Sequence, residues 1–236
     1  IGVQTYSGAN TITGNVVCNF STTSQSTDTT TLQSVCGIMI DTGTLGQVVS
    51  QNVVHSLANT AASAAVCVTG IYYDGNSNGG MISRNLVHSL AVSSTSASSQ
   101  LNGMSFFDGA FTAQNNSVRV GLDSSGAATA GASIVRGIYD NGTTAGRNFY
   151  HNSVYVGGTQ TSGSASTAAF DGTSGVTNAR SYQNNIFVNA RSNSGGSGKH
   201  YAMTNGSVSA PPPGLTSDCN ILYAPGKGGV LGLFNG

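Results

Sequence analysis

The sequence predicts an all-β fold: a right-handed parallel β-helix, or solenoid, of about seven coils with lateral loops rich in Ser, Thr and Ala. Two short elements recur in turn along the whole chain, and such a period marks a repeat architecture. No window shows the apolar spacing of a helix. The chain has no glutamate and only two lysines, so it lacks charged residues that favour helices.

The first recurring element is clearest in two near-identical stretches, Gln51–Leu57 and Arg84–Leu90. Weaker copies extend it to seven anchoring asparagines: Asn15, Asn52, Asn85, Asn116, Asn152, Asn185 and Asn220. Their residue numbers differ in turn by 37, 33, 31, 36, 33 and 35. Because the repeat is unbroken, we predict a single domain over residues 1–236 that forms a segment of a longer solenoid.

Each anchor is predicted to separate two strands. The residue two positions after the anchor is apolar in every copy: Val17, Val54, Val87, Val118, Val154, Phe187 and Leu222. The residue three positions after it is mixed: Cys18, His55, His88, Arg119, Tyr155, Val188 and Tyr223. Because side chains alternate between the faces of a strand, we expect the first set to point inward and the second outward.

The second recurring element predicts a third strand in each coil. It consists of a glycine, a short apolar run, and an Asp or Asn with a glycine close behind, which is a strand-then-turn signal. Excursions of variable length separate the coils: Ser21–Gln33, Ala58–Ala65, Ala91–Gln100, Asp123–Ser133 and Gly158–Thr167. Length variation at one fixed place predicts lateral loops on a solenoid. A seven-bladed propeller is the competing fold, but about 34 residues are few for a blade.

The anchoring asparagines are predicted to be structural. Asn tolerates the left-handed backbone region that a sharp turn between strands requires. Its side-chain amide can also bond to the amides of the coils above and below, as in stacked β structures. These two roles account for all seven asparagines, and we assign them no chemistry.

The composition excludes several kinds of partner. Net charge is zero and six scattered arginines form no basic patch, so no nucleic acid is expected. No apolar run reaches the roughly 18 residues that a membrane helix needs, so no membrane insertion is expected. The four cysteines, Cys18, Cys36, Cys67 and Cys219, are too few for a dense disulfide framework. A bridge between Cys36 and Cys67 and free buried thiols are the two alternatives.

Several stretches resemble the right-handed parallel β-helix repeats of very large secreted proteins from Bacteroidetes-like bacteria. They are Asn148–Gly158, Asn184–Arg191, Gly198–Ala202 and Gly228–Gly236. Such proteins commonly end in a type IX secretion sorting domain. The resemblance covers essentially the whole chain and implies an extracellular or cell-surface location for the parent protein. It implies an architecture rather than an activity.

Two columns of side chains are candidate sites. His55, His88, Arg119 and Tyr155 follow one another on the predicted outer face. This stripe could bind a ligand, or two histidines could bind a metal, although a zinc site needs more than two protein ligands. A solvated polar sheet surface is the alternative.

The second candidate is the set of aspartates that end the third strand: Asp41, Asp74, Asp108, Asp140 and Asp171. A column of carboxylates could hold calcium, which prefers several oxygen ligands. The glycines that follow them favour ordinary Asx turns instead. Calcium is the one cofactor considered.

We therefore expect a non-catalytic structural or adhesive module of a large secreted or surface-attached bacterial protein. Apolar residues at Val16 and Val17 and at Val230–Phe234 lie in the first and last coils without charged or helical caps. The expected partners are neighbouring β-helix segments or the chain itself, joined end to end into fibres. The chain begins at Ile1 without a signal-peptide pattern, which favours an excised portion of a longer protein.

A carbohydrate-active β-helix is the alternative function, either a polysaccharide-binding module or an enzyme, namely a lyase or a glycoside hydrolase. A hydrolase needs two carboxylates in a cleft, and five of the eight carboxylates here occupy the one repeated position. Ice or mineral binding would need a repeated Thr-x-Thr column, which the sequence lacks.

Overall fold

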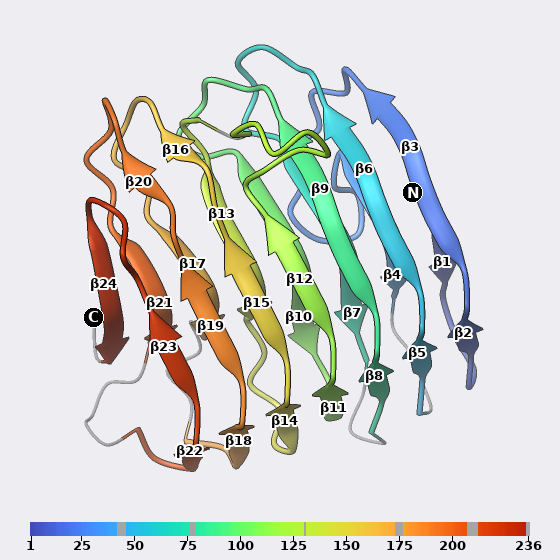
Figure 1. Ribbon diagram of the computed structural model, residues 1–236. Coiled ribbons are helices and arrows are strands. Elements are labelled where there is room, and N and C mark those ends of the chain that lie inside the picture. The colour runs from blue at the N-terminus through green and yellow to red at the C-terminus, as the bar shows by residue number, and fades with distance from the viewer. Residues whose placement is uncertain (42–45, 76–78, 130, 173–176, 207–211, 235–236) are drawn as a thin grey trace.

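The computed structural model describes residues 1–41, 46–75, 79–129, 131–172, 177–206 and 212–234. The chain winds into a parallel β-solenoid with three long sheets, as predicted (Figure 1). Neighbouring strands are parallel in all three. The described residues contain no helix, and so none that is long and apolar enough to cross a membrane.

Each coil contributes one strand to each sheet. Sheet A contains β1 (Val3–Thr5), β4 (Val35–Ile40), β7 (Cys67–Asp74), β10 (Gln100–Asp108), β13 (Ile134–Asp140), β17 (Thr167–Gly172), β21 (His200–Asn205) and β24 (Gly229–Phe234). Sheet B contains β2 (Thr11–Thr13), β5 (Val48–Ser50), β8 (Met81–Ser83), β11 (Phe111–Gln114), β14 (Arg147–Tyr150), β18 (Arg180–Gln183) and β22 (Leu215–Asp218). Sheet C contains β3 (Val16–Thr22), β6 (Val53–Asn59), β9 (Leu86–Val92), β12 (Ser117–Val120), β15 (Ser153–Val156), β19 (Ile186–Asn189) and β23 (Ile221–Tyr223). A short fourth sheet pairs β16 (Thr159–Gln160) with β20 (Ser192–Asn193).

The solenoid is right-handed. In Figure 1 the strands of sheet C run upward on the near side, those of sheet A return downward behind them, and the chain advances from right to left. The seven anchors bound six full turns, and partial turns at both ends bring the total close to the seven coils predicted. Sheet B ends just before each anchor and sheet C begins just after it, as the sequence indicated.

The core fills the interior with an aliphatic column and an aromatic column. The residues two positions after the anchors are buried in the first six coils, which confirms their predicted direction. In the aromatic column, the rings of Phe111 and Phe149 pack edge to face with centroids 5.2 Å apart. Gly70 explains the glycine of the second element, because a Cβ there would lie 2.4 Å from Val87 Cγ1. Glycine thus lets sheets A and C approach closely.

The seven anchoring asparagines form a continuous hydrogen-bond ladder, as predicted. The backbone N–H and the side-chain Nδ2 of each anchor both donate to Oδ1 of the next anchor, at 2.9–3.1 Å. Nδ2 of Asn52 also donates to the carbonyl of Ile12 at 2.9 Å, and later coils repeat this contact. The five inner anchors are at most 1% exposed. Because these polar groups are paired, their burial costs little.

The predicted backbone role of the anchors is wrong, because the left-handed residue is the one before each anchor. Gln51, Arg84 and His151 have φ values of 57°, 56° and 55°, and none of the seven anchors has a positive φ. The anchor must itself be extended to aim its N–H and amide at the next rung. The sharp turn therefore falls one residue earlier, at a position occupied by many residue types.

The Ser/Thr-rich lateral loops satisfy their own backbone polar groups. In residues 23–34, the side-chain oxygens of Ser24, Ser26 and Asp28 each accept a hydrogen bond from the backbone N–H two residues further on. The loop of residues 91–100 repeats the pattern. Short polar side chains here take the place of strand partners. These hydrogen bonds give the loops a defined conformation, although their composition is typical of flexible segments.

All four cysteines are free thiols, so the free-thiol alternative is confirmed. Cys36 and Cys67 are fully buried, whereas Cys18 is partly exposed and Cys219 exposed. Burial raises the pKa of Cys67 to about 11, which keeps this thiol protonated and unreactive.

Candidate functional site

The outer face of sheet A divides into two regions of opposite character. Cys36, Met39 and Tyr72 point outward from β4 and β7, yet they are at most 1% exposed and form a cluster apart from the main core. We call this region the covered half. Further along the same face, β13, β17, β21 and β24 leave a hollow of about 590 Å³, which we call the open groove.

Residues 23–34 lie over the covered half. The Oε1 atom of Gln33 accepts a hydrogen bond from Cys67 Sγ at 3.6 Å. Burial is the main cause that raises the pKa of Tyr72, and the Asp28 carboxylate contributes to the rise. The same carboxylate contributes to the raised pKa of Cys67. Gln33 therefore contacts this part of the sheet directly.

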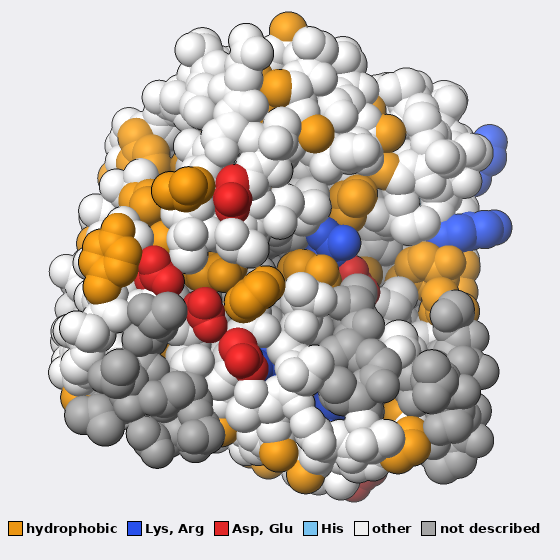
Figure 2. All heavy atoms as spheres, turned by 180° about the vertical axis from the view of Figure 1, so that it is seen from behind, with side chains coloured by type: hydrophobic (Ala, Val, Ile, Leu, Met, Phe, Trp, Pro, Cys, Tyr) orange, Lys and Arg blue, Asp and Glu red, His pale blue; other side chains and the backbone are white. Residues whose placement is uncertain are grey.

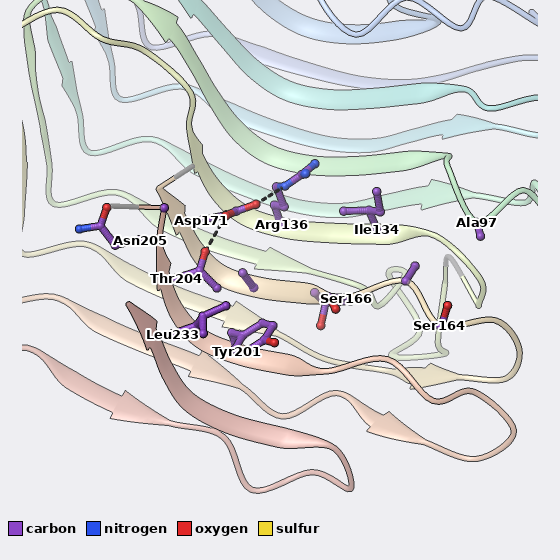
Figure 3. Close-up of a pocket in the computed structure, with 14 residues that line it drawn as sticks. Ala97, Ile134, Arg136, Ser164, Ser166, Asp171, Tyr201, Thr204, Asn205 and Leu233 are labelled. Carbon is purple, nitrogen blue, oxygen red and sulfur yellow. Dashed lines mark hydrogen bonds and ion pairs between the residues drawn. The ribbon is translucent and has the colours of Figure 1, made fainter. Parts of the chain in front are cut away.

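The floor of the open groove is centred on an ion pair. Arg136 Nε lies 2.5 Å from Asp171 Oδ2, and both side chains are only slightly exposed. Thr204 Oγ1 donates to Asp171 Oδ1 at 2.5 Å, and Arg136 Nη1 donates to Gln100 Oε1 at 3.0 Å. The guanidinium carbon of Arg136 lies 4.1 Å from the centroid of the Tyr139 ring. Figure 3 shows Arg136, Asp171 and Thr204 joined in a row, so the charges on the floor neutralise each other.

Strand register creates the hollow. Arg136 lies opposite Ala168, and Ala168 lies opposite Tyr201, so a small side chain stands between two large ones. Asp171 lies opposite Thr204 on the neighbouring column. The depth of the open groove therefore follows from one alanine in the middle of the floor.

The sides of the open groove come from two lateral loops and from the last strand. Ala97, Ser164 and Ser166 line one side, and Leu233 of β24 lies at the other end of the floor (Figure 3). Asp171 is the only carboxylate among the described residues that line it. Glycoside hydrolysis uses two carboxylates, so this hollow offers hydroxyl, aromatic and aliphatic surface for binding rather than a catalytic pair.

The predicted outer stripe lies in a single column of sheet C. His55 pairs with His88, His88 with Arg119, and Arg119 with Tyr155. The two imidazole rings are stacked with centroids 5.0 Å apart, and each Nδ1 lies 2.9 Å from the hydroxyl of the following serine. Burial, then His55 and then Arg119 lower the pKa of His88. The structure brings the four residues together, and ligand binding by them stays a prediction.

Three of the five strand-ending aspartates are aligned. Asp74 lies opposite Asp108 across a register shift, and Asp41 follows the residue that pairs with Tyr73. Burial, then Asp108 and Asp41, raise the pKa of Asp74 to about 6. Acidic side chains are visible as a diagonal row on this face (Figure 2). In the described part of the chain no three His, Cys or acidic side chains are grouped to hold a metal ion, and calcium binding stays a prediction.

The other two aspartates leave the predicted column, which is a correction to the sequence analysis. Asp140 points into the interior, where Arg147 Nε donates to its Oδ1 at 2.7 Å and the Tyr182 hydroxyl donates to its Oδ2 at 3.2 Å. Asp171 lies in the open groove. The cause is spacing: Asp74 follows Gly70 by four residues, but Asp140 follows its glycine by three. A shift of one residue turns a strand side chain to the opposite face.

The sequence analysis did not predict the open groove. Arg136, Tyr201 and Thr204 were not singled out, because each comes from a different coil and none repeats. Counting positions from the glycine column would have placed Arg136 and Tyr201 in one column. Whether a loop covers that column is set by distant residues and has no local signal.

Comparison with protein-family models, with curated proteins and with solved structures finds no match to this chain. The resemblance to secreted Bacteroidetes-like repeats therefore rests on the quoted residues alone. Function must be argued from the geometry of the solenoid and its surfaces.

Proposed function

We propose that this chain is a non-catalytic structural and adhesive module of a large secreted or surface-attached bacterial protein, and that it joins neighbouring β-helix segments or copies of itself end to end. The proposed location outside the cell comes from the resemblance of the repeats. The proposed end-to-end association is supported by the polarity of the asparagine ladder.

The two ends of the ladder are chemically complementary. Within the ladder, each of the first six anchors donates its backbone N–H to Oδ1 of the next anchor toward the C-terminal end. Among the described residues, Asn15 Oδ1 accepts no hydrogen bond and the Asn220 backbone N–H donates none. A following coil that offers an asparagine Oδ1 would therefore continue the ladder without rearrangement. The first rung of a second copy offers that atom in Asn15.

The last rung also presents apolar surface toward the axis. Leu231 lies between Val230, which pairs with Tyr201, and Gly232, which pairs with Met203, so it stands opposite the buried Ala202. In spite of this inward position, Leu231 is 58% exposed. Covering such a side chain stabilises an association by roughly 1.5–3 kcal/mol. Ladder polarity and apolar surface thus favour the same contact.

Light scattering over a wide range of protein concentration tests this proposal, with two matched variants. Leu231→Asp alters the end of the solenoid, and Leu233→Asp alters the outer face of the same strand. We expect the mean mass of the wild-type protein and of Leu233→Asp to rise with concentration, and that of Leu231→Asp to stay at the monomer value. A wild-type monomer at every concentration, or equal effects of both substitutions, contradicts the proposal.

A further inference from the structure

The outer face of sheet A shows which kind of polypeptide segment can lie against it. In the covered half, the occupant is a segment of the protein itself, residues 23–34, in which eleven of the twelve residues are Ser, Thr, Gln or Asp. In the open groove the same columns of the same sheet continue, and no described segment lies over them. Among the described residues, the groove is thus an uncovered continuation of a surface that holds a peptide segment elsewhere.

The contacts in the covered half are made by side chains rather than by strand pairing. Gln33 Oε1 accepts a hydrogen bond from Cys67 Sγ at 3.6 Å. A sheet face offers side chains instead of free backbone groups. A segment is therefore recognised there by its hydroxyl and amide groups and by the surface that it covers.

We propose that the open groove docks an extended Ser/Thr-rich polypeptide segment of another molecule, in the way that residues 23–34 occupy the covered half. The floor spans four strands, from Arg136 on β13 to Leu233 on β24. At about 4.8 Å between strands this is roughly 14 Å, enough for about four extended residues.

The chemistry of the groove favours a segment with little charge. Arg136 and Asp171 already satisfy each other, so a charged ligand would have to compete with an existing ion pair. Tyr201 and Leu233 offer apolar surface for the methyl groups of threonine. The hydroxyl groups of Ser164 and Ser166 stand at the side, within reach of a bound backbone or hydroxyl (Figure 3).

This inference does not depend on end-to-end association. The groove lies on the side of the solenoid, and a segment bound there would join neighbouring molecules laterally. The two proposals can therefore fail separately, provided that binding is measured at a concentration at which the protein is monomeric.

The test uses a fluorescently labelled synthetic peptide with the sequence of residues 23–34 and measures anisotropy against protein concentration. We expect saturable binding to the wild-type protein and at least tenfold weaker binding to Tyr201→Ala. The matched control is Tyr150→Ala, which removes a half-buried tyrosine from β14 of sheet B, outside the groove, and should leave binding unchanged. Leu233→Lys serves as a second groove variant, because Leu233 is 36% exposed and its replacement is compatible with folding.

Three results overturn the proposal. One is the absence of saturable binding up to the solubility limit of the peptide. Another is equal binding by the wild-type protein, Tyr201→Ala and Leu233→Lys. The third is saturable binding of a neutral oligosaccharide, lost in Tyr201→Ala, while the peptide does not bind; this would make the groove a glycan site.

Discussion

The covered half and the open groove are two regions of one sheet face. They share columns of outward side chains but differ in how far solvent reaches those side chains. A single column runs through Met39, Tyr72, Ser105, Tyr139, Asp171, Thr204 and Leu233. Met39 is fully buried at one end, whereas Leu233 is 36% exposed at the other. The strands themselves are alike in direction and pairing. Two features contribute to the difference: residues 23–34 contact Cys67 through Gln33, and the Phe107 ring stacks on Tyr72.

This difference separates the scaffold from the variable parts of the molecule. The ladder and the inner columns fix where each strand lies, and the ladder is the same in both regions although the residues of the inner columns differ. The lateral loops determine which outward side chains are buried in a second core and which stay exposed to solvent. In a solenoid of this kind, surface chemistry can change from coil to coil while the ladder stays constant.

The largest effect on the free energy of unfolding is expected from breaking the buried charge pair of the interior, compared with breaking the charge pair in the open groove. Arg147 and Asp140 are at most 1% exposed, and Arg147 also donates to the carbonyls of Gly109 and Phe106 at 2.8 and 2.9 Å. Arg147→Met should lower the free energy of unfolding by about 3–5 kcal/mol, because it leaves a buried carboxylate unpaired. Arg136→Met, in the open groove, should lower it by about 1 kcal/mol. Chemical denaturation measures both, and similar losses would remove the distinction.

A smaller contrast is expected from truncating the two ends of the shared column. Met39→Ala should cost about 2–4 kcal/mol of unfolding free energy, because it leaves a cavity under residues 23–34. Leu233→Ala should cost less than about 1 kcal/mol, since water already reaches that side chain. Denaturation midpoints compared at equal slopes provide the measurement. Equal costs would show that the loop does not seal the covered half.

The smallest effect depends on pH and has opposite signs in the two regions. Asp74 has its pKa raised to about 6, first by burial and then by Asp108 and Asp41. A raised pKa favours the folded state at low pH, and this advantage is lost as pH rises from about 4 to about 6. Asp74→Asn should therefore raise the melting temperature at pH 8 and leave it nearly unchanged at pH 4. Asp171→Asn, which breaks the pair with Arg136, should lower it at pH 8.

The fold was predictable because its signals repeat. The anchoring asparagines, the apolar residue two positions later and the outward stripe of His55 and His88 recur at one spacing, and each copy supports the others. The ladder follows from the same spacing. The left-handed position was misplaced by one residue, because tolerance of that conformation is a property of Asn in general. This general tolerance does not identify which of two neighbouring residues adopts the left-handed conformation.

The candidate sites were less predictable because they depend on exceptions to the repeat. The aspartate column failed at Asp140, where one residue fewer after the glycine turned the side chain inward. The open groove depends on a single small residue, Ala168, and on the absence of a covering loop in the described coils. Neither leaves a periodic pattern. The cover of residues 23–34 depends on contacts such as that of Gln33 with Cys67, 34 residues away.

The asparagine ladder and the strand hydrogen bonds all run along the axis of the solenoid, and this has a mechanical consequence. A pull on the two ends loads these bonds in the direction in which they separate, one rung at a time. Each coil that unwinds releases 31–37 residues, a contour length of roughly 100 Å or more at about 3.4 Å per residue, against about 4.8 Å of folded height. Because the strands of a coil pair only with those of adjacent coils, the remaining coils stay wound. A stack of such coils would lengthen under force in steps of similar size and act as an extensible tether.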